Sequence, residues 1–367
     1  MLSPKNRRNI SRIIPFGIFW LVFSLIYSFL EKGLLGDLNY YPSTKNPYDF
    51  IGNLSVAATS AFLTGLVLGS IEILYLNKIF SGRSLIKKIV YKTLIYAVLI
   101  ISFLLLNTLF TASIRLETNI LDIRVWTNVW SFFSKFAFWS VEIYIASLIG
   151  ISLFYAEVSE NLGQGVLRNF LTGKYYAPTE EERIFMFLDM KSSTTIAEKL
   201  GHVKYFELLK QYYADISDSI INYSGEIYQY VGDEIVVSWT MKNGLTHANC
   251  IECFFDMKQA LESQSHKYES SYGVFPTFKA GFHLGRVTAG EIGVLKKEII
   301  FTGDVLNTTA RIQELCNSHN VDLLVSGSLI EKLELNPTYK AHHLGKTELR
   351  GRDEEIELYS IKAQNQK

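Results

Sequence analysis

The chain has 367 residues, 48% of them hydrophobic, and its basic and acidic residues balance to a formal net charge of +0. This length allows two or three domains, and the positive mean hydropathy is high for a wholly soluble protein, so we expect the apolar excess in membrane spans. The balanced charge, without a dense run of basic and aromatic residues, argues against nucleic acid as a partner. Three cysteines do not make a disulfide framework.

Four apolar segments near the start of the chain are long enough to cross a bilayer. The first, residues 13–30, has no charged residue and no small-residue cleavage site after it, so it indicates an anchor rather than a signal peptide. The others cover about residues 54–76, 89–110 and 136–155. We therefore predict a four-helix transmembrane domain over residues 13–157, behind a short tail at 1–12.

Basic residues around these segments predict their orientation. They gather before the first span and in the short second loop, whereas the first and third loops mix acidic residues with their few cations. The positive-inside rule then places both termini in the cytoplasm, and we expect an integral protein of a bacterial inner membrane. The residues that decide this are Lys5, Arg7, Arg8, Arg12, Lys78, Arg83, Lys87 and Lys88.

Two glutamates, Glu72 and Glu142, fall inside the predicted spans. An intramembrane carboxylate marks a functional site by default, but our preferred interpretation is a neutral, hydrogen-bonded glutamate that faces the bundle interior. All seven histidines lie at His202 or beyond, which excludes a haem held by paired histidines in the membrane part. The sequence does not identify what the bundle senses.

Residues 158–177 fit an amphipathic connector helix that is interrupted by two glycines and closed by Pro178. A second domain is expected over residues 178–367, in which strand and helix patterns alternate. One βα unit followed by a hairpin and another helix predicts an α+β ferredoxin-like βαββαβ core with additions. Strands are predicted over 184–188, in a hairpin over 227–239, and over 278–283, 299–302 and 356–361; helices are predicted over 193–223, 245–263 and 305–318.

A lone C-x-x-C pair, Cys250 and Cys253, lies in one of these helical patterns. Because no second pair accompanies it, we interpret the two residues as buried thiols, with a metal or redox role as the minor alternative.

The segment IYQYVGDEIVVSW, residues 227–239, contains a Gly232-Asp233 pair that suits a two-residue type II′ turn. In the predicted topology this hairpin tip lies beside the end of the first strand, which brings Asp233 close to Asp189. Two ionised carboxylates about 4 Å apart repel by roughly 4 kcal/mol at an effective dielectric near 20, a cost that divalent cations offset. Oxygen-only ligands favour Mg²⁺ or Mn²⁺. The next segment, KSST at 191–194, opens a helix whose free N–H groups form an anion site, so the arrangement predicts phosphoryl chemistry.

Four segments in this order resemble the motifs of the class III nucleotidyl cyclases: FLDMKSST, YQYVGDEIVVSW, GFHLGRVTAGEIG and GDVLNTTARIQ. The resemblance covers about residues 183–361. It implies an enzyme that makes a cyclic nucleotide from a nucleoside triphosphate with loss of pyrophosphate. It also implies two Mg²⁺ or Mn²⁺ per active site, held by Asp189, Asp233 and the backbone carbonyl of Met190. The triphosphate would lie against Ser192, Ser193 and Thr194.

The motif NTTAR places Asn307 and Arg311 four residues apart, on one helix face and opposite Val305, Ile312 and Cys316. By resemblance, Asn307 orients the ribose and Arg311 stabilises the transition state. The family supplies these two residues from the partner chain, which implies a head-to-tail homodimer with two composite sites.

Near the chain end, ELRGRDEEIELYSI resembles the family's terminal strand, where a lysine meets the triphosphate. Arg350, or as second choice Arg352, would take that place.

Two further positions, Gln229 and Ile300, correspond to those at which the family reads the purine. A glutamine amide can present either a donor or an acceptor, and isoleucine makes no polar contact. We choose ATP because glutamine lacks the carboxylate that favours guanine.

The function predicted from the sequence is therefore a membrane-anchored adenylate cyclase that acts as a homodimer. Guanylate cyclase is the closest alternative. Less favoured are a diguanylate cyclase and a catalytically silent membrane receptor with a cyclase-like dimerisation domain.

Overall fold

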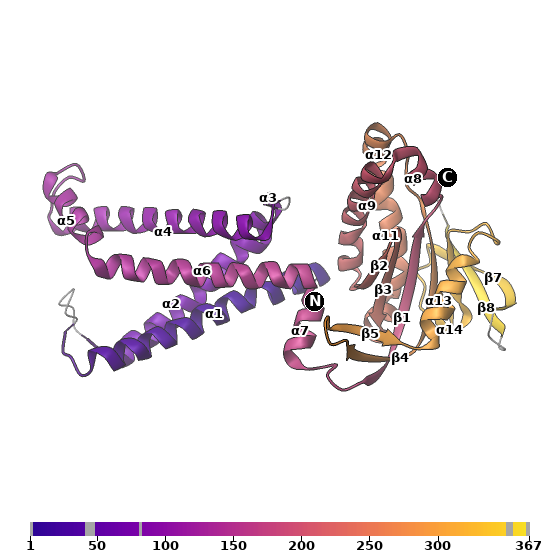
Figure 1. The fold of residues 1–367 in the computed structure, drawn as a ribbon, viewed down its shortest axis with the longest axis horizontal. Coiled ribbons are helices and arrows are strands. Elements are labelled where there is room, and N and C mark those ends of the chain that lie inside the picture. Colours follow the sequence, from indigo (N-terminus) through magenta and orange to yellow (C-terminus); the bar gives the residue numbers. More distant parts are fainter. Residues whose placement is uncertain (1–2, 41–47, 81–82, 350–354, 365–367) are drawn as a thin grey trace. The chain divides into compact units, whose positions relative to one another are not determined.

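The structure, a computed structural model, describes residues 3–40, 48–80, 83–349 and 355–364. It divides into two compact units, one of residues Asn6–Leu167 and one of Arg168–Lys367 together with Met1–Lys5. Figure 1 shows long helices in the first unit and a sheet with helices in the second.

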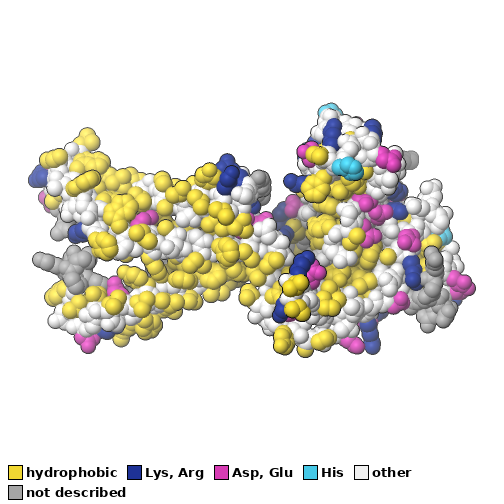
Figure 2. All heavy atoms as spheres, viewed as in Figure 1, with side chains coloured by type: hydrophobic (Ala, Val, Ile, Leu, Met, Phe, Trp, Pro, Cys, Tyr) yellow, Lys and Arg dark blue, Asp and Glu magenta, His cyan; other side chains and the backbone are white. Residues whose placement is uncertain are grey.

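Four helical segments of the described N-terminal unit are long and apolar enough to cross a membrane, which confirms that expectation. Hydrophobic side chains cover much of their visible surface (Figure 2). The segments are α1 (Pro4–Leu35), α2 (Phe50–Ile71) with its continuation to Leu76, α4 (Leu85–Arg115) and α6 (Phe136–Leu162). Each is longer than the expected span at one end or both, because the helices continue into their polar flanks.

The continuation of α2 is a π-helix, η1 (Glu72–Leu76), followed by the single turn α3 (Asn77–Ile79). Glu72 is buried in this unit and accepts a 2.5 Å hydrogen bond from Lys92 of α4. It therefore faces the bundle interior as expected, and its partner there is a lysine ammonium. Glu142 is also buried, and its Oε1 has no hydrogen-bond partner in the described part of the chain.

The third loop contains a helix that the sequence interpretation did not include, α5 (Ile123–Phe133). The Asp122 side chain caps it by accepting a 2.8 Å hydrogen bond from the Arg124 amide. Val125 and Val129 are buried on its inner face, with residues of α4 in the same cluster. An 11-residue amphipathic helix is too short to register as a span.

The connector region is split between two helices. α6 ends at Leu162, because Gly163 after it has a φ of +86°, and α7 (Gln164–Thr172) follows. Gly165 lies inside α7, so one glycine interrupts the helix and not two. The compact C-terminal unit begins within α7, at Arg168.

The described strands of the C-terminal unit form one eight-stranded sheet in the order β2-β3-β1-β4-β6-β8-β7, with β5 paired to β4. The antiparallel set β2-β3-β1-β4 has the ferredoxin-like order, so the predicted core is confirmed. The strands are β1 (Thr179–Met190), β2 (Glu226–Val231), β3 (Glu234–Thr240), β4 (Phe278–Ile292), β5 (Glu298–Thr302), β6 (Leu323–Ser326), β7 (Tyr339–Glu348) and β8 (Glu355–Ala363).

Helices connect and cover these strands. The larger ones are α8 (Ser193–Leu200), α9 (His202–Asn222), α11 (Asn249–Ser263), α12 (Ser265–Tyr272) and α13 (Asp304–Glu314); the short ones are α10 (Met241–Leu245), η2 (Thr246–Ala248) and α14 (Gly327–Ile330). Cys250 and Cys253 are free thiols buried in α11, as expected.

Side chains of β1 alternate between the two faces of the sheet. Ile184, Met186 and Leu188 join the main core with residues of α9 and α11, whereas Phe185 and Phe187 pack in a second cluster with Val305 of α13. Figure 1 shows α9 and α11 on one side of the sheet and α13 on the other. Asp189 alternates in step with Phe185 and Phe187, so its side chain lies on the α13 side of the sheet.

Candidate active site

The two predicted metal-binding aspartates lie at the ends of neighbouring strands. Asp189 is the penultimate residue of β1 and pairs in register with Glu234 of β3. Asp233 is the second residue of the turn between β2 and β3; Gly232 before it has a φ of +64°, as a type II′ turn requires. Burial, then hydrogen bonding to Asp233 and the charge of that residue, raise the pKa of Asp189. The structure therefore brings the two carboxylates together.

Two donors contact one oxygen of Asp189. The Gln313 side chain on α13 donates a 3.2 Å hydrogen bond to Oδ2, and the Lys279 ammonium lies 3.5 Å from the same atom. Lys279 is the register partner of Asp189 on β4, and its charge opposes the rise in the pKa of Asp189. Neither residue was identified from the sequence. The available signal was polarity at positions that the strand and helix patterns bury.

A hollow of about 370 Å³ opens beside Asp189. Its lining includes Met190, Ser192, Ser193 and Thr194, all of them predicted site residues, on the connection from β1 into α8. Ser192 has a left-handed backbone conformation, with φ +54°, immediately before α8 begins. The remaining lining residues are Lys191, Lys279, Cys316, Asn317, Asn320 and Val321. Lys191 pairs with Asp322 and Lys279 with Asp189, so the start of α8 is the feature that makes this hollow suitable for an anion.

The donors at this edge fit a divalent cation. Two carboxylates and a backbone carbonyl form an oxygen-only set, and Mg²⁺ commonly uses one or two carboxylates together with substrate phosphates. Within the described ranges, His, Cys, Asp and Glu form no group of three that could hold a metal by itself. Burial, followed by the charges of Asp189 and Asp233, raises the pKa of Glu234 to about 7. The excess negative charge of this edge is what a cation would neutralise.

The other predicted pair, Asn307 and Arg311, lies on the outer face of α13. Asn307 is exposed and Arg311 is half-buried, whereas Val305 and Ile312 are buried, as the helical spacing predicted. Cys316, just beyond the helix, is buried as well. Neither Asn307 nor Arg311 is among the described residues that line the hollow beside Asp189. Asp233 is not among them either, so the hollow contains one of the two predicted metal-binding aspartates and neither residue of this pair.

The two base-reading positions lie on strands that contact each other. Gln229 is exposed on β2, next to a bulge, and Ile300 is half-buried on β5. The neighbouring rings of Tyr228 and Phe301 have centroids 5.0 Å apart, and the Phe301 amide donates a 3.2 Å hydrogen bond to the Tyr228 hydroxyl. Thus β5, which pairs with β4, also contacts β2 through these two residues. Arg350 and Arg352 lie outside the described residues.

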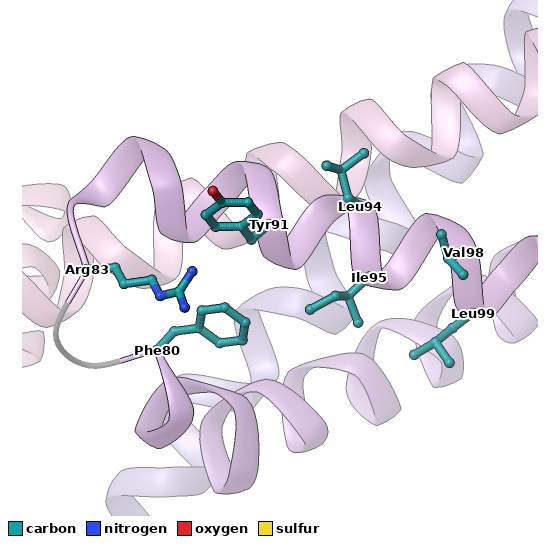
Figure 3. A pocket seen from close by; sticks show the side chains of 7 residues that line it. All are labelled: Phe80, Arg83, Tyr91, Leu94, Ile95, Val98 and Leu99. Atoms are coloured by element: carbon teal, nitrogen blue, oxygen red, sulfur yellow. The ribbon is translucent and has the colours of Figure 1, made fainter.

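A hollow of about 500 Å³ lies on the four-helix unit, with Phe80 and Arg83 at one end (Figure 3). The Arg83 guanidinium lies 5.4 Å from the ring centroid of Phe80 and 5.2 Å from that of Tyr91. The rest of the lining is aliphatic and comes from α4: Leu94, Ile95, Val98 and Leu99. No carboxylate is among the described residues that line this hollow, so those residues lack the ligands for a metal–phosphate site.

Residues 175–363 match the family described as the Adenylate and Guanylate cyclase catalytic domain. Adenylate cyclase 2 of Rhizobium meliloti (strain 1021) is 36% identical over 224 residues, which are 61% of this chain and 62% of that protein. The Adenylate cyclase of Anabaena cylindrica is 24% identical over 194 residues, 51% of this chain and 38% of the relative. The chain thus spans less than two thirds of either relative.

One solved structure, that of a bacterial light-regulated adenylyl cyclase, is similar with a TM-score of 0.52 and 21% identity. The similarity covers 62% of this chain and 66% of that one, and it is a similarity of fold.

Proposed function

The chain belongs to the family of adenylate and guanylate cyclase catalytic domains, and from that premise we propose that it is a membrane-anchored adenylate cyclase. The proposed reaction converts ATP to 3′,5′-cyclic AMP and pyrophosphate at a homodimer interface. The observation that carries the proposal is the meeting of Asp189 and Asp233 at one sheet edge, beside a hollow that Ser192, Ser193 and Thr194 line. Both relatives described above are adenylate cyclases.

In this reaction the ribose 3′-oxygen bonds to the α-phosphorus, the bond from that phosphorus to pyrophosphate breaks, and the hydroxyl proton leaves to solvent. Two Mg²⁺ or Mn²⁺, when bound, supply a lowered pKa for the hydroxyl and neutralise charge on the departing pyrophosphate. Asp189, Asp233 and the Met190 carbonyl would hold these ions. The start of α8, with Ser192, Ser193 and Thr194, binds the phosphates in this proposal.

Asn307 and Arg311 act, in this proposal, on the nucleotide held by the partner subunit. Their position on the outer face of α13, where Asn307 is exposed, supports an action in trans. Apolar exposure on the C-terminal unit supports a dimer. Val294 and Leu295, in the turn between β4 and β5, are 97% and 103% exposed, and Ile292 before them is 56% exposed.

The four apolar helices anchor the enzyme in a membrane, with both termini and the catalytic unit in the cytoplasm. The apolar outer surface of these helices supports the embedding (Figure 2). The basic residues in the N-terminal part of α1, in α3 and at the start of α4 support the orientation. ATP is available on that side.

The full-length protein in detergent, incubated with Mn²⁺ and either ATP or GTP, tests the activity by product mass. Cyclic AMP from ATP is the expected product. Cyclic GMP alone would establish the guanylate cyclase alternative, which the exposed Gln229 amide permits because it can serve either purine. Cyclic di-GMP, or no product from a protein that binds Mn²⁺, would refute the proposal.

Mixed dimers test the composite site. In a mixed dimer, Asp189→Asn on one chain and Arg311→Ala on the other fall in the same composite site, which loses a metal ligand and the transition-state group, while the second site keeps both. Each variant alone should be inactive, and co-expressed chains purified by two different tags should regain one competent site of the two. No recovered activity in a verified heterodimer would rule out action in trans.

A further inference from the structure

Two buried side chains contact the carboxylate of Asp189. Gln313 and Lys279 both contact its Oδ2, at 3.2 and 3.5 Å, and are only 4% and 8% exposed. With one carboxylate oxygen engaged by two donors, rotation of the Asp189 side chain is restricted. Such contacts behind a metal ligand fix its orientation and tune metal affinity.

Gln313 differs from Lys279 in the element that carries it. It lies on α13, the helix that also carries Asn307 and Arg311. Because an α-helix has 3.6 residues per turn, Gln313, two residues after Arg311, points roughly 200° around the helix axis from Arg311. The burial pattern agrees, because Gln313 is buried and Asn307 is exposed. One helix therefore presents an amide inward to Asp189 and the Asn307–Arg311 pair outward.

The same point of α13 is fixed to the sheet. A Cβ added at Gly281 of β4 would lie 2.4 Å from the backbone nitrogen of Gln313 and 2.8 Å from the backbone carbonyl oxygen of Thr309. The helix backbone thus contacts β4 directly at the residue whose side chain reaches Asp189. Little freedom is left for Gln313 to move without moving α13.

We propose that Gln313 is a positioning residue that links the two active sites of the homodimer. Its amide orients Asp189 in the site where its own chain supplies the metal ligands. Through α13 it also sets Asn307 and Arg311 for the site where the partner supplies them. The inference rests on the proposed function, because the second role requires a composite site.

Mn²⁺ binding without nucleotide tests the first role. Gln313→Met keeps the length of the side chain and removes the donor; we expect Mn²⁺ affinity of the full-length protein to fall about tenfold or more, measured by electron paramagnetic resonance of free Mn²⁺. Gln211→Met is the matched control, because Gln211 donates a 2.8 Å hydrogen bond to Asp215 on α9. It should change Mn²⁺ affinity less than about twofold, since α9 supplies no ligand in the proposed metal set.

If Gln313→Met does not fold, Gln313→Asn serves instead, because its amide is one methylene too short to reach Asp189. Wild-type Mn²⁺ affinity in a folded Gln313 variant would overturn the proposal. So would an equal loss in the Gln211 control.

Mixed dimers test the second role. In a dimer of an Asp189→Asn chain and an Arg311→Ala chain, one competent site remains, with metal ligands from the Arg311→Ala chain. Adding Gln313→Met to that chain should raise the half-saturating Mn²⁺ concentration about tenfold. Adding it to the Asp189→Asn chain should instead lower turnover about tenfold at saturating Mn²⁺, with half-saturation unchanged.

If Gln313→Met changes activity in only one of the two chains of the mixed dimer, the proposed link between the two sites is refuted. An inactive parent mixed dimer would refute the composite site itself and the link with it. The nucleotide-free Mn²⁺ binding result would then still decide whether Gln313 orients Asp189.

Discussion

Lys92 of α4 lies with its ammonium 2.5 Å from Glu72 and 3.0 Å from Glu157 of α6, and all three side chains are buried. Tyr96 donates a 3.3 Å hydrogen bond to Glu72, and Lys88 lies 2.9 Å from Glu157. The cluster joins α4, α6 and the π-helix η1, and local π-turns of this kind are frequent at functional sites.

Removing the lysine from this cluster should destabilise the four-helix unit. Lys92→Met leaves the buried Glu72 carboxylate without its counter-charge, whereas Glu157 keeps Lys88, so we expect a loss of about 3–5 kcal/mol in the free energy of unfolding. Denaturant unfolding of the full-length protein in detergent measures it. The double variant Lys92→Met/Glu72→Gln should recover part of the loss. Lys87→Met, at an exposed position on the same helix, is the control, and equal effects of both lysine variants would contradict a buried ion pair.

The aspartate pair predicts opposite stability effects with and without metal. Asp233→Asn removes a charge that raises the pKa of Asp189. In EDTA at pH 7 the variant should therefore melt at the same temperature as the wild type or higher. Saturating Mn²⁺ should raise the melting temperature of the wild type and leave the variant nearly unchanged. If Mn²⁺ raises the melting temperature of Asp233→Asn as much as that of the wild type, Asp233 is not a metal ligand.

The pH dependence of the metal-free protein follows from the same pair. The folded-state pKa of Asp189 lies above its unfolded value, so the folded protein binds that proton more tightly. Stability should fall as pH rises from the unfolded pKa, near 3.9, through the raised folded pKa. Glu234 adds to the fall, up to its folded pKa of about 7. Melting in EDTA between pH 5 and 8 measures the slope, which should be shallower for Asp233→Asn. A slope of the opposite sign would be incompatible with two crowded carboxylates.

The contact between β4 and α13 predicts a steric effect of a single methyl group. Gly281→Ala places its Cβ against backbone atoms of Gln313 and Thr309, which cannot rotate away. We expect a loss of about 1–3 kcal/mol in unfolding free energy, as for other overpacked cores, together with reduced turnover because α13 carries Arg311. Gly165→Ala in α7 is the control, since nothing lies within 4 Å of its added Cβ. Unchanged stability and turnover in Gly281→Ala would contradict the close approach.

Purine choice should respond to Gln229. Gln229→Glu supplies a carboxylate that accepts from guanine N1–H and N2–H, and a hydrogen bond to a charged group contributes about 1.5–3 kcal/mol. The ratio of kcat/KM for GTP to that for ATP should therefore rise about tenfold or more. Gln229→Lys, which donates to adenine N1, should shift the ratio the other way. If both variants have the same ratio of kcat/KM for GTP to that for ATP, Gln229 does not take part in base recognition.

Local sequence was sufficient for much of this protein. Apolar runs of about 20 residues predict spans because the length and composition of a helix that crosses a bilayer are properties of one segment. The outward face of Asn307 and Arg311 followed from helical spacing alone. The ferredoxin-like order followed from the alternation of strands and helices, because few topologies accommodate it.

Long-range packing decided the rest. Gln313 meets Asp189 across 124 positions because α13 approaches β4 at Gly281, and Lys279 meets it because of the register of β1 with β4. Lys92, inside a predicted span, became half of an ion pair only when α4 packed beside Glu72 and Glu157. A sequence pattern states which face of an element is apolar, but strand register and helix approach depend on contacts between distant segments.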